Sequence, residues 1–325
     1  MNQVVRPLNP TCWQRVTLGN ALGPTIFHED WWLNAATNGA YEVAEVSNGG
    51  VVVGSLPYWR TRRLGLVWCK MPPLTPFLGP VIDISDTKGT AYLQRRMQIT
   101  HDLILKLPSA SFLQIKCHRD VSDVLAFQEQ QFKSNVQFTH EIRPAPDNIL
   151  WDNLHAVRRQ QIKNAQARLD IATLDNPEPF LRFYRTNLNA RGITDRYNNL
   201  ECSKIIVACI NRQRGRILAA KDKKGVLQAA IFCVWDATSA YYMMTTRSLS
   251  SWHGCVSALL WEAIKDASHR NLIFDFGGVG TKGSVRFYSD FGGVVRPRYV
   301  VTKMTFPVGL AYTLLSGFGR EQFFY

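Results

Sequence analysis

With 325 residues, of which 46% are hydrophobic and 11% aromatic, the chain can fill two domain cores, and this composition excludes an intrinsically disordered protein. The formal net charge of +13 favours an anionic ligand or surface: nucleic acid, a nucleotide cofactor or anionic lipid. Charge alone does not choose among these, and a basic solvated surface without a dedicated partner is the alternative.

The seven cysteines are scattered, and no two of them form a CxxC pair. This pattern indicates a reducing compartment and argues against a zinc site, so we expect no metal. Residues 1–7 lack the apolar segment of a signal peptide, and the longest apolar runs are shorter than the ~20 residues that span a bilayer. We therefore expect a cytoplasmic protein, with peripheral attachment to the inner face of the membrane as an open alternative.

The first half of the chain reads as a hairpin, a helix and a strand. The valine-rich segment 50–59 predicts a strand, 60–65 a turn and 66–71 a second strand. Apolar residues recur at helical spacing over 91–106, and 112–117 predicts a further strand.

A basic helix is expected over residues 154–169, where apolar residues gather in one arc. Arg158 falls inside that arc, and a buried guanidinium needs either a core carboxylate or an anion held in a cleft. Arg159 and Lys163 lie one turn apart on the opposite side. They are either phosphate contacts or members of a solvated face.

The second half repeats the order seen in the first. Residues 226–235 predict a strand, 236–239 a turn, 240–246 a strand, 256–267 a helix and 272–276 a closing strand. The repeated order of hairpin, helix and strand indicates two similar α/β domains, although no residue identity links the two halves.

The boundary between the halves is expected in the turn-rich segment 144–148. We therefore predict an N-terminal domain over 1–146 and a C-terminal domain over 147–304. The apolar and aromatic tail, 305–325, is expected to pack back on the N-terminal domain.

The loop before the helix 256–267 is a candidate anion site. It contains His253, Gly254 and Cys255, and the amide groups at a helix start attract phosphate. Only one glycine is available there, so an ordinary helix start is the alternative.

A glycine-rich segment follows the strand 272–276. Gly278, Gly280 and Gly283 match G-x-G-x-x-G, but the acidic residue that a dinucleotide fold needs ~20 positions later is missing. The order of a P-loop is also absent. We expect instead a flexible turn, with Asp275 at the end of the strand either as a functional carboxylate or as a cap on the turn. An aromatic and basic cluster follows, with Arg286, Phe287 and Tyr288.

Five segments in the second half resemble, in order, the Fem-like branch of the GNAT-related acyltransferases, including the branch found with bacterial polysaccharide synthesis. They span about 140 residues. The segments are Arg158-Arg159-x-x-Ile162-Lys163-x-Ala165, 183–192, 260–264, 274–278 and Arg286-Phe287-Tyr288-x-x-Phe291-Gly292.

The resemblance implies an α/β (α+β) fold with two tandem GNAT-like domains, each a mixed sheet flanked by helices. It also implies an N-acyltransferase that moves an acyl or aminoacyl group to an amine on a sugar, glycan or cell-envelope precursor. The donor is acyl-CoA in the polysaccharide branch and aminoacyl-tRNA in the peptidoglycan branch. Both are co-substrates, and no covalently bound cofactor or DNA partner is expected.

One departure from the family bears on the donor. Peptidoglycan-modifying members often carry Phe-Lys in the closing motif, whereas this chain has Phe287-Tyr288. A tyrosine can donate a proton or a hydrogen bond but brings no positive charge to a developing oxyanion. The sequence therefore favours acyl-CoA over aminoacyl-tRNA.

The expected mechanism is direct attack of the amine on the donor carbonyl. Asp275, or a water that it holds, would accept the amine proton, and Tyr288 would protonate the leaving group or steady the oxyanion. The residues expected to bind substrate are Arg158, Arg159, Lys163, Arg247, Arg286 and Phe287, and those expected at the donor are His253, Gly254 and Cys255. The competing hypotheses are a non-catalytic nucleotide- or glycan-binding protein and an RNA-binding protein.

Overall fold

The computed structural model describes residues 22–84, 89–195 and 199–317. The chain forms two compact units: unit 1 is Met1–Val136 with Arg298–Tyr325, and unit 2 is Gln137–Pro297. Both crossings between the units fall inside long strands rather than in loops.

These strands are β6 (Lys133–Ile142) and β12 (Val294–Met304). The expected boundary segment 144–148 lies after β6, inside unit 2. A turn-rich segment marks the end of a strand, but a strand can pass from one compact unit to the next without any break in regular structure.

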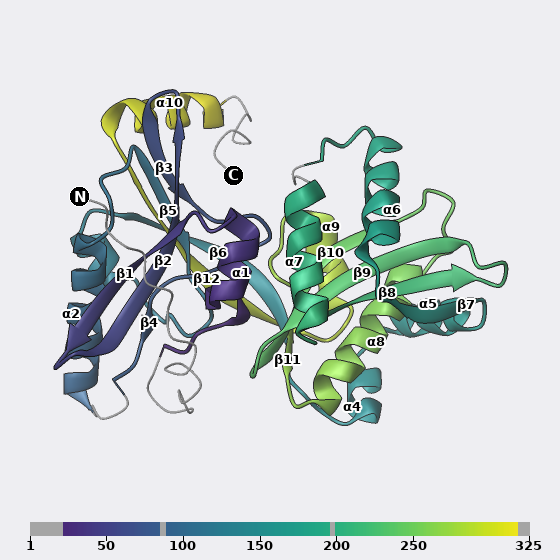
Figure 1. The fold of residues 1–325 in the computed structure, drawn as a ribbon. Coiled ribbons are helices and arrows are strands. Elements are labelled where there is room, and N and C mark those ends of the chain that lie inside the picture. Colours follow the sequence, from purple (N-terminus) through teal and green to yellow (C-terminus); the bar gives the residue numbers. More distant parts are fainter. Residues whose placement is uncertain (1–21, 85–88, 196–198, 318–325) are drawn as a thin grey trace. The chain divides into compact units, whose positions relative to one another are not determined.

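Unit 1 is a mixed sheet covered by helices (Figure 1). Its other elements are η2 (Ile26–His28), α1 (Asp30–Thr37), β1 (Tyr41–Asn48), β2 (Val51–Arg63), β3 (Leu66–Lys70), β4 (Val81–Ile82), α2 (Thr90–Leu105), β5 (Phe112–Lys116), α3 (Leu125–Glu129) and α10 (Phe306–Gly317). The strand order is β1-β2-β3-β5-β12, in which β3 and β5 are parallel and the other neighbours antiparallel. Helix α2 packs against β1 and β2.

The expected turn at 60–65 is wrong. Strand β2 continues to Arg63, and only Leu64 and Gly65 form the turn, with φ of 51° and 75°. Two consecutive residues with positive φ suit the right-handed twist of a hairpin, which is why a two-residue loop suffices. The charged residues before the turn hid the strand, because they lie on an exposed hairpin that alternation of apolar residues does not mark.

Unit 2 is a second mixed sheet, with helices on both faces (Figure 1). Its other elements are α4 (Asp147–Asp152), α5 (Ala156–Gln166), β7 (Leu169–Leu174), α6 (Pro177–Asn189), α7 (Asn199–Asn211), β8 (Gly215–Asp222), β9 (Leu227–Trp235), β10 (Ser239–Arg247), α8 (Cys255–His269), β11 (Ile273–Asp275) and α9 (Lys282–Ser289). The strand order is β6-β11-β10-β9-β8-β7, and only β10 and β11 run parallel.

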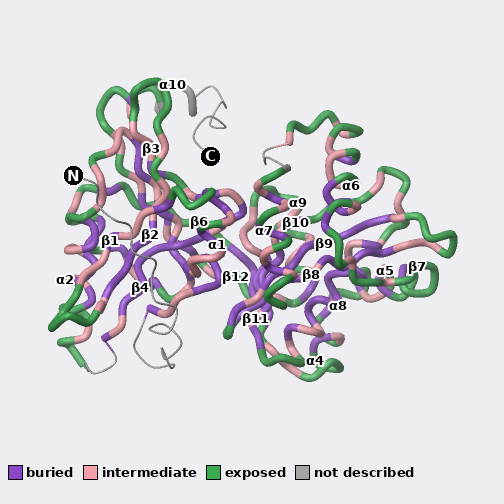
Figure 2. The backbone as a smooth tube through the Cα atoms, viewed as in Figure 1, coloured by how far each residue is buried: buried purple, intermediate pink, exposed green. Residues whose placement is uncertain are grey.

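Strand β9 lies at the centre of unit 2 and is buried on both faces (Figure 2). Ala229, Ile231 and Cys233 face the core built with α5 and α8. The alternate residues point the other way, where Phe232 approaches Cys209 of α7 beside Gly215. A continuous apolar run is what a strand covered by helices on both sides requires.

The expected helices and strands of the second half are present with shifted ends. The basic helix expected over 154–169 is α5, which is shorter at both ends. The segment after β11 is only partly a turn, because α9 begins at Lys282 and carries the aromatic and basic cluster. Thr281 and Ser284 form a capping box at the start of α9. This pair could have predicted the helix from the sequence, but the surrounding glycines favoured a turn instead.

Candidate functional site

Unit 2 contains a cavity of about 660 Å³ where two parallel strands separate. Strand β10 pairs with β11 only as far as Tyr241 and Asp275, and then continues alone on that side to Arg247. The cavity opens beyond this last pair and is lined from α5, α6, β10, the start of α8, and α9. Its lining includes Arg158, Asn187, Arg191, Tyr242, Arg247, Leu249, Trp252, His253, Gly254, Cys255, Ser257, Phe287 and Tyr288.

The start of α8 forms one wall of the cavity. Gly254 is the N-cap residue, with φ of 88° and no side-chain hydrogen bond to the first turn. A β-carbon at Gly254 would lie 2.4 Å from the backbone oxygen of Gln161, so the close packing of α8 on α5 requires glycine here. The amide groups of this first turn, with the positive end of the helix dipole, favour a bound anion.

The neighbours of Gly254 differ in what they can contribute. His253 is exposed and lines the cavity mouth. Cys255 is buried, and its burial raises the pKa of the thiol. A protonated, buried thiol is a poor nucleophile. Cys255 therefore serves to pack the wall of the cavity that the start of α8 forms.

Arg158 of α5 lines the cavity and is also paired inside the protein. Its guanidinium donates to Asp290 Oδ2 at 2.8 Å and to Ser257 Oγ at 2.9 Å. The same group lies 4.3 Å from the ring centre of Phe287. The two roles weighed from the sequence, a core ion pair and a cleft residue, are therefore combined in one side chain.

Tyr288 of α9 lies in an aromatic cluster at the cavity. Its ring stacks on Phe276 with a centre-to-centre distance of 4.4 Å and meets Tyr242 edge-on at 6.3 Å. Burial raises the pKa of the Tyr288 hydroxyl, and burial followed by the neighbouring Tyr288 raises the pKa of Tyr242. Both phenols are therefore protonated at neutral pH and available as hydrogen-bond or proton donors.

His140 of β6 completes this cluster. Its ring meets Tyr288 at 6.0 Å, and its Nε2 lies 3.1 Å from Ser289 Oγ. Because Ser289 Oγ donates to the Val285 carbonyl, we assign the proton to Nε2. Nδ1 is buried without a hydrogen-bond partner in the described part of the chain, and burial lowers the pKa of the ring.

Three of the expected substrate-binding cations do not line the cavity. Arg159 donates to the carbonyls at the end of α4, including those of Asp152 and Leu154 at 3.0 Å. Lys163 is exposed, with its ammonium 5.7 Å from the Trp151 ring centre. Arg286 is exposed on α9. Helical spacing placed Arg159 and Lys163 on a basic face of α5, but that face is turned away from the cavity, and Arg286 was expected beside it only from its place in the aromatic and basic cluster.

Asp275 is fully buried and does not line the cavity. Its Oδ1 accepts hydrogen bonds from Thr139 Oγ1 at 2.6 Å and from the Gly277 amide at 2.8 Å. The Gly278 amide in turn donates to Thr139 Oγ1. Asp275 therefore fixes the turn after β11, which is the capping alternative considered from the sequence.

Three polar residues of the cavity, Arg191, Asn187 and Tyr242, were not found from the sequence. Arg191, just after α6, donates to the backbone carbonyls of Asn187 at 2.9 Å and Arg247 at 2.7 Å. Asn187 donates to Thr246 Oγ1 across the same wall. A basic residue at a helix end was the available signal for Arg191, whereas Tyr242 lies in a buried stretch of β10 that carries no such signal.

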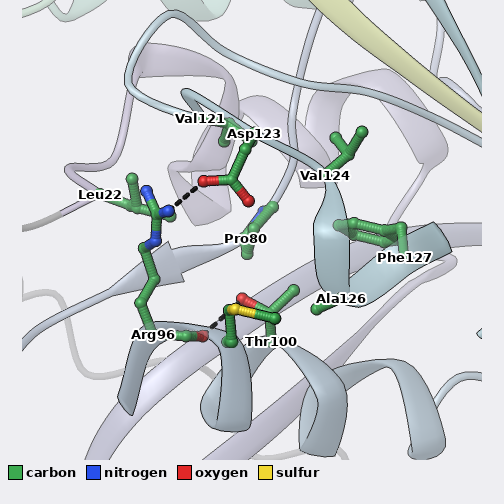
Figure 3. A pocket seen from close by; sticks show the side chains of 10 residues that line it. Leu22, Pro80, Arg96, Thr100, Val121, Asp123, Val124, Ala126 and Phe127 are labelled. Atoms are coloured by element: carbon green, nitrogen blue, oxygen red, sulfur yellow. Dashed lines mark hydrogen bonds and ion pairs between the residues drawn. The ribbon is translucent and has the colours of Figure 1, made fainter. Parts of the chain in front are cut away.

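Unit 1 contains a much smaller cavity, of about 10 Å³. In Figure 3, Arg96 of α2 and Asp123 point toward one another across it and form an ion pair. Arg96 also donates to Ser122 Oγ at 2.9 Å. A space of this size holds about one water, so it is a packing defect beside a buried ion pair rather than a substrate site.

Solved structures with this fold span most of the chain. FemX superposes with a TM-score of 0.66 at 14% identity, covering 89% of this chain and 94% of FemX. A tandem GNAT protein from the clavulanic acid biosynthesis pathway gives 0.51 at 12% identity, covering 84% of this chain and 87% of that protein. The chain has the tandem GNAT-like fold. The expected fold class, two GNAT-like domains that are each a mixed sheet flanked by helices, is thereby confirmed.

A further structure with the fold is the C-terminal domain of a putative lysylphosphatidylglycerol synthetase from Agrobacterium fabrum. It has a TM-score of 0.58 at 10% identity and covers 88% of this chain and 92% of that domain. No family model and no curated protein matches the sequence. The superpositions establish the fold, but at identities this low they do not assign a reaction, which has to be argued from the residues of the cavity.

Within the described residues, no group of His, Cys, Asp and Glu side chains is arranged to hold a metal ion. Over the same residues, no helix combines the length and the apolar character needed to cross a bilayer.

Proposed function

We propose that unit 2 transfers an acyl or aminoacyl group from an activated, phosphate-bearing donor to an amine. One observation carries this proposal: Arg191 and Arg247 line the cavity together with the start of α8 and with Arg158, whose charge is paired with Asp290, and none of the described lining residues is acidic. Such a cavity attracts an anion, and Tyr288 lines the same cavity where β10 and β11 separate, so we expect that anion to bind near Tyr288.

Acyl-CoA is the favoured donor, and aminoacyl-tRNA is the alternative. The start of α8 can hold a pyrophosphate through backbone amides, with Arg247 close to it in the same lining. The closing motif supplies Tyr288 in place of a lysine, so it offers a neutral proton donor rather than a fixed positive charge. The proposed acceptor is an amine on a sugar, glycan or cell-envelope precursor, in keeping with the fold that the chain shares with FemX.

In the proposed reaction the amine nitrogen attacks the thioester carbonyl, a C–N bond forms, and the C–S bond breaks. The amine proton passes to water, since no lining carboxylate is present to accept it. Tyr288 donates its proton to the leaving sulfur and regains one from solvent, which its raised pKa favours. Asp275 acts as a positioning residue, because it holds the turn that follows β11.

The first test is binding of acetyl-CoA to the full chain, measured by calorimetry. Arg247→Gln should weaken binding by about tenfold, the usual size for a charge-assisted hydrogen bond. The matched control is Arg212→Gln, which removes the same charge from an exposed residue outside the cavity lining and should bind like the parent protein. Equal affinities for all three proteins would refute the assignment of the donor site.

The absence of a carboxylate from the described cavity lining also favours a second candidate, a non-catalytic protein that binds a nucleotide or glycan. Mass spectrometry of the full chain incubated with acetyl-CoA and amino sugars separates the transferase from the non-catalytic binding protein. Binding without any acylated product would support the binding protein. Binding of tRNA with a steep dependence on salt and no effect of the acyl group would instead support RNA binding.

A further inference from the structure

The C-terminal helix α10 exposes an apolar stripe. Phe306, Leu310 and Leu314 are spaced four residues apart and are 82%, 51% and 57% exposed. Residues 305–317 contain no charged side chain. The opposite side of the helix is anchored, because Val308 is buried. The stripe therefore faces away from the protein, where an apolar surface this continuous needs an explanation.

A basic hairpin tip belongs to the same part of unit 1. Arg62 and Arg63 are exposed, and Leu64 at the turn is 92% exposed. Residues 60–70 contain four cations and no carboxylate. Figure 2 shows the tip of the β2–β3 hairpin as an exposed segment.

Packing joins the helix to the hairpin. Val308 forms a small apolar cluster with Phe112 of β5, Trp68 of β3 and Met304 of β12. Trp68 lies two positions after Leu66, which pairs with Arg63 across the hairpin. Figure 1 accordingly shows α10 beside the start of β3, near the tip of the β2–β3 hairpin. Two segments more than two hundred residues apart in the sequence (roughly 60–70 and 305–317) thus form one surface.

We propose that this surface binds an anionic phospholipid bilayer. The lipid-facing surface consists of Arg62, Arg63, Leu64, Phe306, Leu310 and Leu314. Apolar side chains flanked by arginines match the interface of such a bilayer, where the stripe enters the acyl boundary and the cations meet the headgroup phosphates. This inference concerns unit 1 and does not rest on the proposed transfer reaction.

Charge decides between a bilayer and other occupants. An apolar groove on a protein partner would cover the stripe without any need for the arginines beside it. Each arginine near an anionic membrane strengthens binding by a factor of about five at low salt. With no carboxylate in residues 60–70 or 305–317 to oppose them, Arg62 and Arg63 favour the anionic surface.

The test is sedimentation of the full chain with vesicles. We expect binding to mixed phosphatidylglycerol and phosphatidylcholine vesicles, much weaker binding to phosphatidylcholine alone, and a decline as salt rises. Arg62→Gln with Arg63→Gln should weaken binding to the anionic vesicles by about twenty-fivefold. Phe306→Ser with Leu310→Gln should weaken it by at least about tenfold.

The matched control is Lys224→Gln with Val226→Gln, a cation and an exposed valine at the β8–β9 turn of unit 2. This variant should bind vesicles like the parent chain, and circular dichroism should show all variants folded, since every changed side chain is exposed. The proposal is overturned if the parent chain ignores anionic vesicles or if the control loses as much binding as the surface variants. It is equally overturned if light scattering shows a dimer that Phe306→Ser with Leu310→Gln dissociates while vesicle binding is unchanged.

Discussion

Gly254 lines the cavity and also has a backbone conformation that favours glycine. It holds a left-handed conformation at the start of α8, and its Cα faces the carbonyl of Gln161 on α5. We expect Gly254→Ala to lower the free energy of unfolding by about 3 kcal/mol, from conformational strain and from contact with that carbonyl. Urea denaturation measures the change.

Gly225 is the control for this prediction. It also has positive φ, 80°, but a β-carbon there would meet nothing within 4 Å. Gly225→Ala should therefore cost about 1 kcal/mol, from backbone strain alone. Equal losses for the two variants would show that the approach of α8 to α5 does not depend on glycine.

The outcomes at single residues separate two kinds of inference. Burial of Arg158 followed from its place in an apolar arc, and the structure confirms it. The phosphate role expected for Arg159 and Lys163 followed from charge on a helix face, which says nothing about what the face meets. Arg159 instead donates hydrogen bonds to the carbonyls of Asp152 and Leu154 at the end of α4. The spacing of residues along the sequence does not predict these contacts.

At the scale of elements, α9 connects the glycine-rich segment to the cavity. Its start is held by reciprocal hydrogen bonds between Thr281 and Ser284, and its far end carries Phe287 and Tyr288 into the lining. None of the residues of α9 is fully buried, and only Phe287 and Tyr288 near its end pack against the core of unit 2, so packing contributes little to its first turn. The cap should therefore matter more here than in a helix with a buried face.

Thr281→Ala should destabilise α9 locally by about 1 kcal/mol, the usual cost of losing an N-cap. Hydrogen exchange of the α9 amides should become about fivefold faster while the global unfolding midpoint changes little. Thr281→Ser keeps the hydroxyl and should exchange like the parent chain. Unchanged exchange in the alanine variant would mean that contacts of the aromatic cluster, and not the cap, hold the helix.

Long periodic elements were predictable, and short or exposed ones were not. The bounds of helix α8 and strand β9 were predicted to within one or two residues. Their apolar patterns extend over many residues, so single residues that depart from the pattern have little effect. The exposed end of β2 was read as a turn, since charged residues on a solvated hairpin leave no burial pattern. The turn itself consists only of Leu64 and Gly65, which both have positive φ.

At the scale of the whole molecule, unit 1 contains a pair of buried histidines. The rings of His28 and His118 meet edge-on at 5.3 Å. Burial, followed by the neighbouring His118, lowers the pKa of His28 to about 3. Burial also lowers the pKa of His118, against the opposing effect of Asp120. Both rings are therefore neutral in the folded protein.

Because the unfolded chain binds these protons near the ordinary pKa of 6.5, the two histidines make stability depend on pH. The contribution of His28 is complete above pH 6.5 and is lost as pH falls from 6.5 toward 3, and the contribution of His118 is lost in the same direction. The expected slope is about 1.4 kcal/mol per pH unit for each histidine. Denaturation at pH 7.5 and 5.0 measures it.

The comparison proteins for this prediction are His118→Gln and His155→Gln. The first should flatten the loss of stability between pH 7.5 and 5.0, although removing a buried ring lowers stability at both values. The second changes an exposed histidine and should leave the slope as it is. A parent chain equally stable at both values would contradict the neutral buried pair.

The amino-acid sequence by itself determined the α/β character, the repeated order of hairpin, helix and strand, and the rejection of a dinucleotide or P-loop reading of the glycines. These depend on local patterns and on residues that must stand at set spacings. Tertiary structure alone decided where the units divide, since β6 and β12 cross the division without a break. It also decided that Asp275 is buried while Arg191 and Tyr242 line the cavity. A site where two strands separate is assembled from five elements, and which face each element presents to it is set by packing across the whole unit.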